Sequence, residues 1–593
     1  MRWKVGRAGK LIGIVMVSIT HGAEVQMWLE DAMIRVMRQT PPHETTDLRL
    51  HAARGEWEPF QVVLTGPAEA WRGARVRASE LRGSDGTTLP APQVWREHYV
   101  TVEKASLHAP LPPGDYPDAL VPQDFPEAPP PSADTLNQPF WVDVKVPYAV
   151  PAQRYRGAVE AQLTDGTVLR REYELEVWDF DLPVTPSLRS SFWLSPHRVA
   201  ELHGFGRAQE NPPPELAQLL EAYATLLAEH RLSIFQMWAT ARTRGDQLDT
   251  EAVEPVLRRQ LLHRHAACLA VPLAEDWPFS DPLGRDRPAL KRYLADWVHL
   301  LEKIHAPGRT YLALGSLDEP NDAAGYERVR RWGALVDEAE QQHGIRLPLM
   351  VTEQPVPDDP TWGDLIGAAD IWVPHFSAVY EDLESPDGKR EIARRLAAGE
   401  EVWTYAALAQ FSDSWMREHD RPAIVYEGHP PAWLTDYPPI NHRIVPWLMA
   451  LHGLTGLTYW DLLHFPPEVD PWQQAGTLND PQTGAVFNGD GCLLYAATPD
   501  RFGVQQPVAS IRLKWLREAA EDFDYLTLAQ QAGHGEQARA WTETFARGFG
   551  DWSDDVPALQ AARLALGRRL GGHGEDAPAQ REVIRPAQPV KAP

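Results

Sequence analysis

The stretch from Tyr311 to Pro320, YLALGSLDEP, sets the pattern from which the architecture can be inferred. A short apolar run is followed by two adjacent acids, Asp318 and Glu319, and then by a proline. Neighbouring side chains on an extended strand point to opposite faces, so adjacent acids can share a pocket only where the strand bends or ends. Because the ring of Pro320 clashes with a helical conformation of the residue before it, we expect an extended backbone at Glu319.

Short apolar runs of this kind recur eight times after residue 187 and alternate with amphipathic helices, predicted over Pro214 to His230 and Ala289 to Ile304. Strand-then-helix units in this number are typical of a barrel of parallel strands. Residues 187–487 are therefore predicted to form a central (β/α)8 TIM barrel. The runs cover residues 190–194, 232–238, 268–273, 311–315, 347–352, 370–376, 401–406 and 454–460.

The chain is predicted to be multidomain, with further domains on both sides of the barrel. Residues 24–182 contain runs that alternate apolar with polar side chains between Gly, Pro and Asp turns, such as PFQVVL at 59–64, and this pattern predicts a β-sandwich domain. Residues 488–570 contain the strand-like NGDGCLLYA and a helix predicted over Ser510 to Gln530. They are expected to form a small C-terminal strand-plus-helix domain.

The two ends of the chain differ from the rest in composition. Basic residues precede the apolar run Leu11 to Ile19, which is too short to span a membrane, and residues 1–23 resemble a signal peptide. An exported protein, periplasmic, extracellular or at the cell surface, is expected, the alternative being a ragged cytoplasmic N-terminus. Residues 571–593 are rich in Gly, Pro and charge without periodicity, which predicts a disordered tail.

Charge and cysteine content narrow the possible partners. A formal net charge of -25 argues against nucleic acid or anionic lipid as a partner and favours a neutral or cationic ligand. Cys268 and Cys492 have no metal-like spacing and are expected to be core thiols, with one disulfide as the alternative. His263 and His265 are two apart, a poor ligand spacing on a helix, so no metal and no cofactor is predicted. The oligomeric state stays open.

Active sites of such barrels lie at the C-terminal ends of the strands, so the residues that end each run are the candidates. Carboxylates and aromatic rings on one rim suit a carbohydrate, since acids can act on the glycosidic oxygen while flat rings pack against the sugar. His375 has an alternative structural role. The candidates are Trp238, Glu275, Asp276, Asp318, Glu319, Glu353, His375, Trp403, Tyr405, Tyr459, Trp460 and Asp461.

The chain resembles glycoside hydrolase family 123 over nearly its whole length. The resemblance is carried by ARGEWEPFQVVL at 53–64, by LDEP, by IWVPHF, VWTYA and TYWD, and by GDGCLLYA with the following SIRLKWLREAAEDFDYL. That family contains retaining β-N-acetylgalactosaminidases, and its adjacent acid pair falls on Asp318 and Glu319 here. A glycan or glycoconjugate substrate is implied.

The resemblance implies substrate-assisted catalysis. Glu319 would protonate the leaving oxygen while the acetamido carbonyl of the substrate attacks the anomeric carbon, and Asp318 would hold the acetamido N–H. The seventh run has no acid until Asp413, which disfavours a second catalytic carboxylate there, although Glu353 or Asp461 could take that place. A glycosidase for another sugar and a non-catalytic carbohydrate-binding protein remain alternatives.

Some charged residues near the C-terminus have a structural interpretation. Glu518, Glu521 and Asp522 are most simply the solvated face of the last long helix. Arg443 is expected to form a structural ion pair rather than to bind a ligand.

Overall fold

The computed structural model describes residues 25–43, 48–106, 109–126, 135–207, 212–235, 243–355, 359–379, 383, 385–407, 431–479 and 486–572. The predicted signal peptide and Trp238 lie outside the described residues, as does the predicted tail beyond residue 572.

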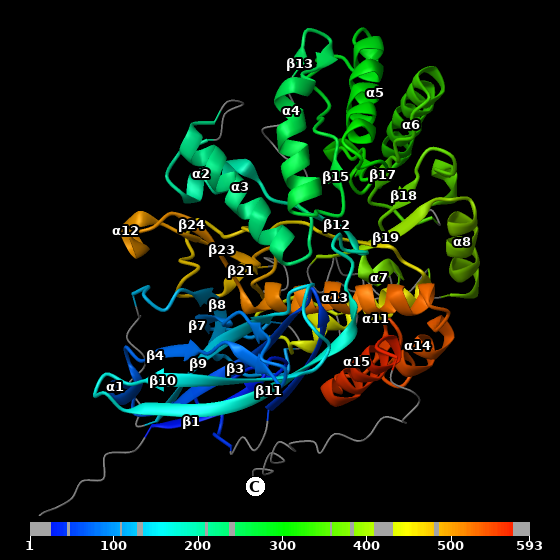
Figure 1. Ribbon diagram of the computed structural model, residues 1–593. Helices are drawn as coiled ribbons and strands as arrows, with labels where there is room; N and C mark the ends of the chain where they lie inside the picture. The colour runs from blue at the N-terminus through cyan, green and yellow to red at the C-terminus, as the bar shows by residue number, and fades with distance from the viewer. Residues whose placement is uncertain are drawn as a thin grey trace, which may run out of the picture.

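Two antiparallel-rich sheets make up the N-terminal region and share one apolar core (Figure 1). Alternating side chains such as Phe60, Val62 and Leu64 from one sheet and Tyr155, Val159 and Leu175 from the other are buried together. The first sheet has the order β1 (Gln26–Asp31), β3 (Trp57–Gly66), β9 (Leu136–Lys145), β7 (Gln93–Val102), β8 (Gly114–Val121). The second has the order β2 (Leu48–Arg54), β11 (Val168–Asp181), β10 (Arg154–Gln162), β5 (Leu81–Gly83), β6 (Thr88–Leu89), with β4 (Arg75–Ala78) beside β10 and the short helix α1 (Ala68–Trp71) after β3.

The next region is built on short parallel strands, one in each predicted run apart from the second, of which the structure describes residues 232–235. They are β12 (Arg189–Phe192), β15 (Leu269–Ala270), β16 (Thr310–Tyr311), β17 (Met350–Val351), β18 (Ile371–Trp372), β19 (Glu401–Ala406) and β20 (Gly456–Tyr459). Parallel pairing gives the order β12-β20-β19-β18-β17 and joins β15 to β16.

Single backbone links connect these two groups of strands. A parallel bridge joins Leu312, after β16, to Leu349, before β17. On the other side, Phe192 of β12 bridges Ile234, and the N–H of Ala270 in β15 donates to the carbonyl of Phe235 at 2.8 Å. The described backbone therefore runs from strand to strand in a ring, whose interior holds Cys268, Tyr311, Met350, Ile371 and Trp403.

Helices lie outside this ring (Figure 1). The helices predicted around residues 214–230 and 289–304 are confirmed as α3 and α5, each with a buried apolar face. α6 begins at an N-cap where Asp322 accepts from the N–H of Gly325 at 2.6 Å and ends at the left-handed Gly344. The helices are α2 (Pro196–Leu202), α3 (Pro214–Glu229), α4 (Thr250–Leu257), η2 (Arg258–His263), α5 (Arg287–Lys303), η3 (Gly315–Leu317), α6 (Ala323–His343), η4 (Pro360–Trp362), α7 (Phe376–Ala378), α8 (Pro386–Ala397), α10 (Ile440–Arg443) and α11 (Val445–His452), and β13 (Thr243–Arg244) pairs with β14 (Gln247–Leu248) before α4.

The C-terminal region packs against both of the preceding regions. Its long helix α13 lies between the N-terminal sheets and the ring (Figure 1), and the apolar core is continuous through all three, including Trp141, Leu219 and Trp515. Its elements are β21 (Gly476–Asn479), β22 (Val486–Asn488), β23 (Leu494–Ala497), α12 (Pro499–Phe502), β24 (Gln506–Ala509), α13 (Ile511–Gln531), α14 (Gly535–Thr542), β25 (Ala546–Gly548), β26 (Asp551–Trp552) and α15 (Val556–Leu570). The prediction of a multidomain, sheet-rich chain is confirmed to this extent: each of the three regions contains β-sheet.

The prediction that Glu518, Glu521 and Asp522 face solvent is wrong. All three carboxylates are buried, because α13 is covered on every side and its charged side chains meet opposite charges from other elements. Asp522 accepts two hydrogen bonds from Arg443, at 2.9 and 3.0 Å, which confirms the structural ion pair expected of that arginine. An amphipathic pattern alone does not distinguish a solvated face from one buried against charges.

Both cysteines, Cys268 and Cys492, are free and buried, so the thiol interpretation holds and the disulfide alternative does not. Within the described part of the chain, every helix is too short or too polar to cross a membrane. Nor do the described residues bring together three or more His, Cys, Asp or Glu side chains in a cluster that could hold a metal ion.

Candidate active site

The two adjacent acids lie at the end of the fourth strand region, directly after the short turn η3. Asp318 is extended, with φ -78° and ψ 126°, but Glu319 has φ 44°, in the left-handed region. The expectation of an extended Glu319 is therefore wrong. A left-handed residue reverses the local direction of the chain, and this explains how two neighbours that would diverge on a strand come to share one partner. Both side chains are exposed.

That shared partner is Thr352, which directly follows β17. Its hydroxyl donates to Asp318 Oδ1 at 2.6 Å and accepts from the backbone N–H of Glu319 at 2.7 Å. One side chain from the neighbouring strand thus fixes the carboxylate of the first acid and the backbone of the second. The sequence analysis missed Thr352, although its position at the end of the fifth run was a usable signal.

Tyr405, in β19, reaches across to the second acid. Its hydroxyl donates to Glu319 Oε1. Burial raises the pKa of Tyr405 well above its usual range, and the negative charges of Glu319, Asp318 and Glu353 raise it further. The tyrosine therefore keeps its proton and remains a donor, and Glu353 lies near enough to act on the same group.

The turn that carries the acids is also held from the strand on its other side. Glu275, which follows β15, accepts a hydrogen bond from the N–H of Ser316 at 2.6 Å. Burial alone would raise the pKa of Glu275, but hydrogen bonds from Ser316 outweigh it and leave the pKa below its ordinary value. Arg328 donates to the carbonyl of Ser316 at 3.0 Å. The ionised Glu275 is thus a fixed acceptor beneath the acid pair.

His375 lies beside Tyr405 but its ring nitrogens are used by the protein. Nδ1 accepts from the N–H of Ser377 at 3.1 Å and so caps α7, and Nε2 lies 2.8 Å from the carbonyl of Ala407. The His375 and Tyr405 rings meet edge to face at 4.9 Å. Burial lowers the pKa of His375 to about 4, so the ring is neutral at ordinary pH and holds Tyr405 in place.

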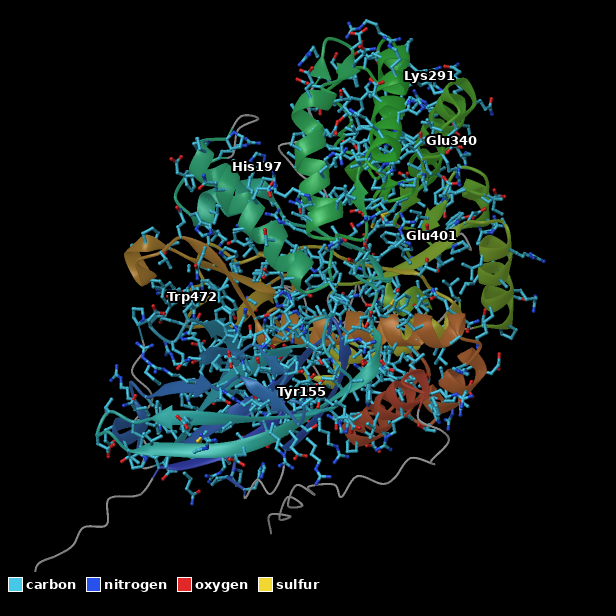
Figure 2. The ribbon with its side chains drawn as sticks, viewed as in Figure 1. Tyr155, His197, Lys291, Glu340, Glu401 and Trp472 are labelled. Atoms are coloured by element: carbon cyan, nitrogen blue, oxygen red, sulfur yellow. The ribbon has the colours of Figure 1, made fainter. Side chains whose placement is uncertain are left out.

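Trp403, two residues before Tyr405, points into the ring but lies deeper. It is fully buried against Tyr311, and its indole N–H donates to Glu401 Oε2 at 2.8 Å. Glu401, labelled beside β19 in Figure 2, also pairs with Arg189. These contacts lie at the start of β19, away from the acid pair, and describe a packed and hydrogen-bonded interior residue.

The residues that end the eighth run are tied to the C-terminal region. Tyr459 and Trp460 donate to the two carboxylate oxygens of Asp490, each at 3.1 Å. Asp461 is buried and accepts from the N–H groups of Leu462 and Leu463 at 2.7 and 3.0 Å. Only Trp460 of the three is partly exposed at this rim.

One aromatic residue at the ring was not among the predicted candidates. Trp193 directly follows β12, is 40% exposed, and packs against Phe235 with ring centroids 4.8 Å apart. The backbone N–H of Trp193 donates to the carbonyl of Tyr459 at 2.9 Å. The run SSFWL contains it, so its place near a strand end was readable. The structure thus brings Asp318, Glu319 and Tyr405 together, with His375 behind them, and leaves Trp403 and Tyr459 in the interior.

No protein-family model matches the chain, and no curated protein matches it. Among solved structures, a family 123 glycoside hydrolase from Clostridium perfringens is similar over 93% of this chain and 98% of its own, with 12% identity and a TM-score of 0.62. A family 39 glycoside hydrolase from Bacteroides cellulosilyticus covers 80% of this chain and 82% of its own, with 10% identity and a TM-score of 0.31. A β-glucuronidase from Bifidobacterium dentium covers 84% of this chain and 67% of its own, with 11% identity and a TM-score of 0.29.

The weight of these similarities differs. The two lower TM-scores carry no argument, whereas the alignment to the Clostridium perfringens enzyme spans nearly all of both chains. At 12% identity it concerns the course of the backbone and leaves the site chemistry to the residues themselves. The chain therefore has the fold of a glycoside hydrolase.

Proposed function

We propose that this protein is a retaining glycoside hydrolase that releases a β-linked 2-acetamido sugar, N-acetylgalactosamine being favoured, by substrate-assisted catalysis. The observation that carries the proposal is the pairing of Asp318 and Glu319 on one exposed turn, with both acids held through Thr352. In this proposal the ring of parallel segments is a (β/α)8 barrel and the two N-terminal sheets form a β-sandwich. We also propose that the protein is exported.

The chemistry follows from the positions of the two acids. Glu319 in its protonated form gives its proton to the glycosidic oxygen as the bond to the anomeric carbon breaks. The substrate's acetamido oxygen forms a bond to that carbon from the opposite face, and the product is an oxazolinium ion. Ionised Asp318 accepts the acetamido N–H, which orients the carbonyl and balances the developing positive charge. Water then forms a bond to the anomeric carbon as the bond to the acetamido oxygen breaks, and the water gives a proton to Glu319, so that the acetamido group is restored and the configuration is retained.

The proposal is tested by the release of 4-nitrophenol from aryl β-glycosides of N-acetylgalactosamine, N-acetylglucosamine, galactose and glucose. Turnover is expected only with the 2-acetamido sugars. Glu319→Gln should abolish most turnover of substrates with poor leaving groups, and Asp318→Asn should lower the rate on N-acetyl substrates by about 100-fold or more. Glu302→Gln, an exposed carboxylate on α5, is the matched control and should behave like wild type. Undiminished turnover of an alkyl 2-acetamido glycoside in Glu319→Gln would contradict the assignment, whereas 4-nitrophenol is a good leaving group that needs little help from an acid.

A second candidate is a glycosidase for a different sugar that uses Glu319 with a protein nucleophile. The observation in its favour is Glu353, a buried carboxylate that follows Thr352 and acts electrostatically on Tyr405 together with Glu319. That enzyme would hydrolyse plain hexosides, would lose activity in Glu353→Gln, and would not be inhibited by a thiazoline analogue of the 2-acetamido sugar. Glycan binding without any turnover would instead identify a carbohydrate-binding protein.

A further inference from the structure

The turn bearing the acid pair is anchored from the strands on both sides. Glu275, after β15, holds the N–H of Ser316 at 2.6 Å, two residues before the first acid. Thr352, after β17, holds the N–H of Glu319 at 2.7 Å and the carboxylate of Asp318 at 2.6 Å. The anchoring matters because a left-handed backbone at a residue other than glycine, such as Glu319 with φ 44°, is strained and persists only when its surroundings hold it.

The hydroxyl of Thr352 donates to only one of the two carboxylate oxygens of Asp318. A threonine hydroxyl has one proton, and here that proton goes to Oδ1. Oγ1 of Thr352 also accepts from the N–H of Glu319, so the donor and one acceptor position of this hydroxyl are both engaged. The contact with Oδ1 leaves Oδ2 of Asp318 to accept an N–H from a substrate. One residue therefore sets both the rotation of Asp318 and the origin of the Glu319 side chain.

We propose that Thr352 is a positioning residue that sets the relative geometry of the two acids, an inference that rests on the proposed function. Thr352 touches neither the glycosidic oxygen nor the anomeric carbon in this scheme, and acts through Asp318 and Glu319. Its loss is expected to reduce the rate of the chemical step and to leave sugar binding nearly intact. Misplacing a reacting group by about 1 Å can cost about 100-fold in rate, which sets the scale of the effect.

The test compares Thr352→Val, which removes the hydroxyl at nearly constant volume, with Thr352→Ser, which keeps it. For hydrolysis of an aryl 2-acetamido glycoside, Thr352→Val should lower kcat by about 10- to 100-fold while KM changes by less than about threefold. Thr352→Ser should stay within about threefold of wild type. Thr352→Ala, which also lacks the hydroxyl, provides the test if the valine variant does not fold.

A matched control separates positioning from general stability. Thr310→Val removes another threonine hydroxyl, at the start of β16, where it accepts from Trp297 at 2.8 Å and donates to the carbonyl of Leu269 at 3.0 Å. That variant should lower the thermal midpoint but retain kcat. Equal losses of kcat in Thr310→Val and Thr352→Val would overturn the positioning role.

A binding measurement keeps this inference distinguishable from the proposed function. Calorimetric titration with the thiazoline analogue of N-acetylgalactosamine should show at least a fivefold weaker Kd for Thr352→Val than for wild type, because the analogue's ring engages Asp318. If the wild-type protein turns over the glycoside and binds the analogue, and Thr352→Val has the same kcat and the same Kd, the inference is overturned and the proposed function stands. A wild-type protein that neither turns over the glycoside nor binds the analogue would overturn both.

Discussion

At Glu319 a single backbone angle determines whether the acid pair can act together. With φ 44° the residue turns back toward Thr352, and its carboxylate meets the hydroxyl of Tyr405. The residue after it is a proline, whose steric effect favours an extended predecessor. Hydrogen bonds with Thr352, after β17, and with Tyr405, in β19, outweigh this local preference, so the strained conformation depends on the fold around it.

Tyr405→Phe is expected to lower kcat on a 2-acetamido glycoside by about 10- to 100-fold. The Glu319 carboxylate becomes charged as it gives up its proton, and a hydrogen bond to a charged group contributes about 1.5–3 kcal/mol, where about 1.4 kcal/mol corresponds to tenfold in rate. Because burial and nearby negative charges hold the pKa of Tyr405 well above its usual range, deprotonation of Tyr405 itself should add no limb to the wild-type pH–rate profile below pH 9. Steady-state kinetics of both proteins from pH 4 to 9 measures kcat and this profile. Tyr116→Phe, whose hydroxyl donates to Pro112 in the N-terminal region, is the control. An unchanged kcat in Tyr405→Phe would show that the hydrogen bond from Tyr405 to Glu319 does not contribute to the rate.

The sequence indicates some of these residues and conceals others for physical reasons. Asp318, Glu319 and Tyr405 stand out because they are acids and an aromatic ring at the ends of apolar runs, where barrels of parallel strands place their active sites. Thr352 is not indicated by the sequence, because a threonine after a strand is ordinary. Its role comes from two hydrogen bonds, with Asp318 and with the backbone N–H of Glu319, that only the fold brings about. Trp403 has the same parity as Tyr405, yet depth along β19 places it in the interior, and parity alone does not report depth.

Within the element β7, one buried acid lacks the partner that burial normally requires. Neither carboxylate oxygen of Glu97 has a hydrogen-bond partner among the described residues, and burial raises its pKa to about 8, with Arg35 opposing that change. A neutral, protonated Glu97 is therefore the form that this strand holds at neutral pH. The alternating runs that predict a β-sandwich over residues 24–182 give no sign that Glu97 faces inward.

Glu97→Gln should become progressively more stable than wild type as the pH rises from about 4.5 to 8. In that window the folded protein holds the proton and the unfolded chain does not, so wild-type stability falls with pH by at most about 1.4 kcal/mol per unit. Glutamine has no proton to lose. Thermal midpoints of both proteins at pH 5 and pH 8 measure the difference, with exposed Glu80→Gln as control. A gap between Glu97→Gln and wild type that is the same at both pH values would contradict the assigned titration.

At the scale of the whole molecule, α13 links the N-terminal sheets to the ring through buried charges. Its Arg517 and Lys514 pair with Asp143 of β9, and its Asp522 pairs with Arg443 of α10. Helical periodicity predicts α13 almost to its ends, Ile511 and Gln531. It cannot predict that a highly charged helix is central, because the compensating charges come from segments distant in sequence, 371 and 374 residues away for Asp143 and 79 for Arg443. The predicted domain boundaries therefore fall within one continuous core.

These buried pairs should make the regions unfold together. Arg512 of α13 donates to both oxygens of Asp118 in β8 at 2.9 Å, and both side chains are fully buried. Arg512→Met leaves that carboxylate without its cation, which typically costs about 3–5 kcal/mol, whereas the double variant Asp118→Asn with Arg512→Met should recover part of the loss. Exposed Arg170→Met, which breaks a surface pair with Glu160, should leave the thermal midpoint nearly unchanged.

Calorimetry of the wild type should show one transition, and Arg512→Met should lower it or split it at the junction between β8 and α13. Two separate transitions already present in the wild type would show that the buried charges do not couple the N-terminal sheets to the ring.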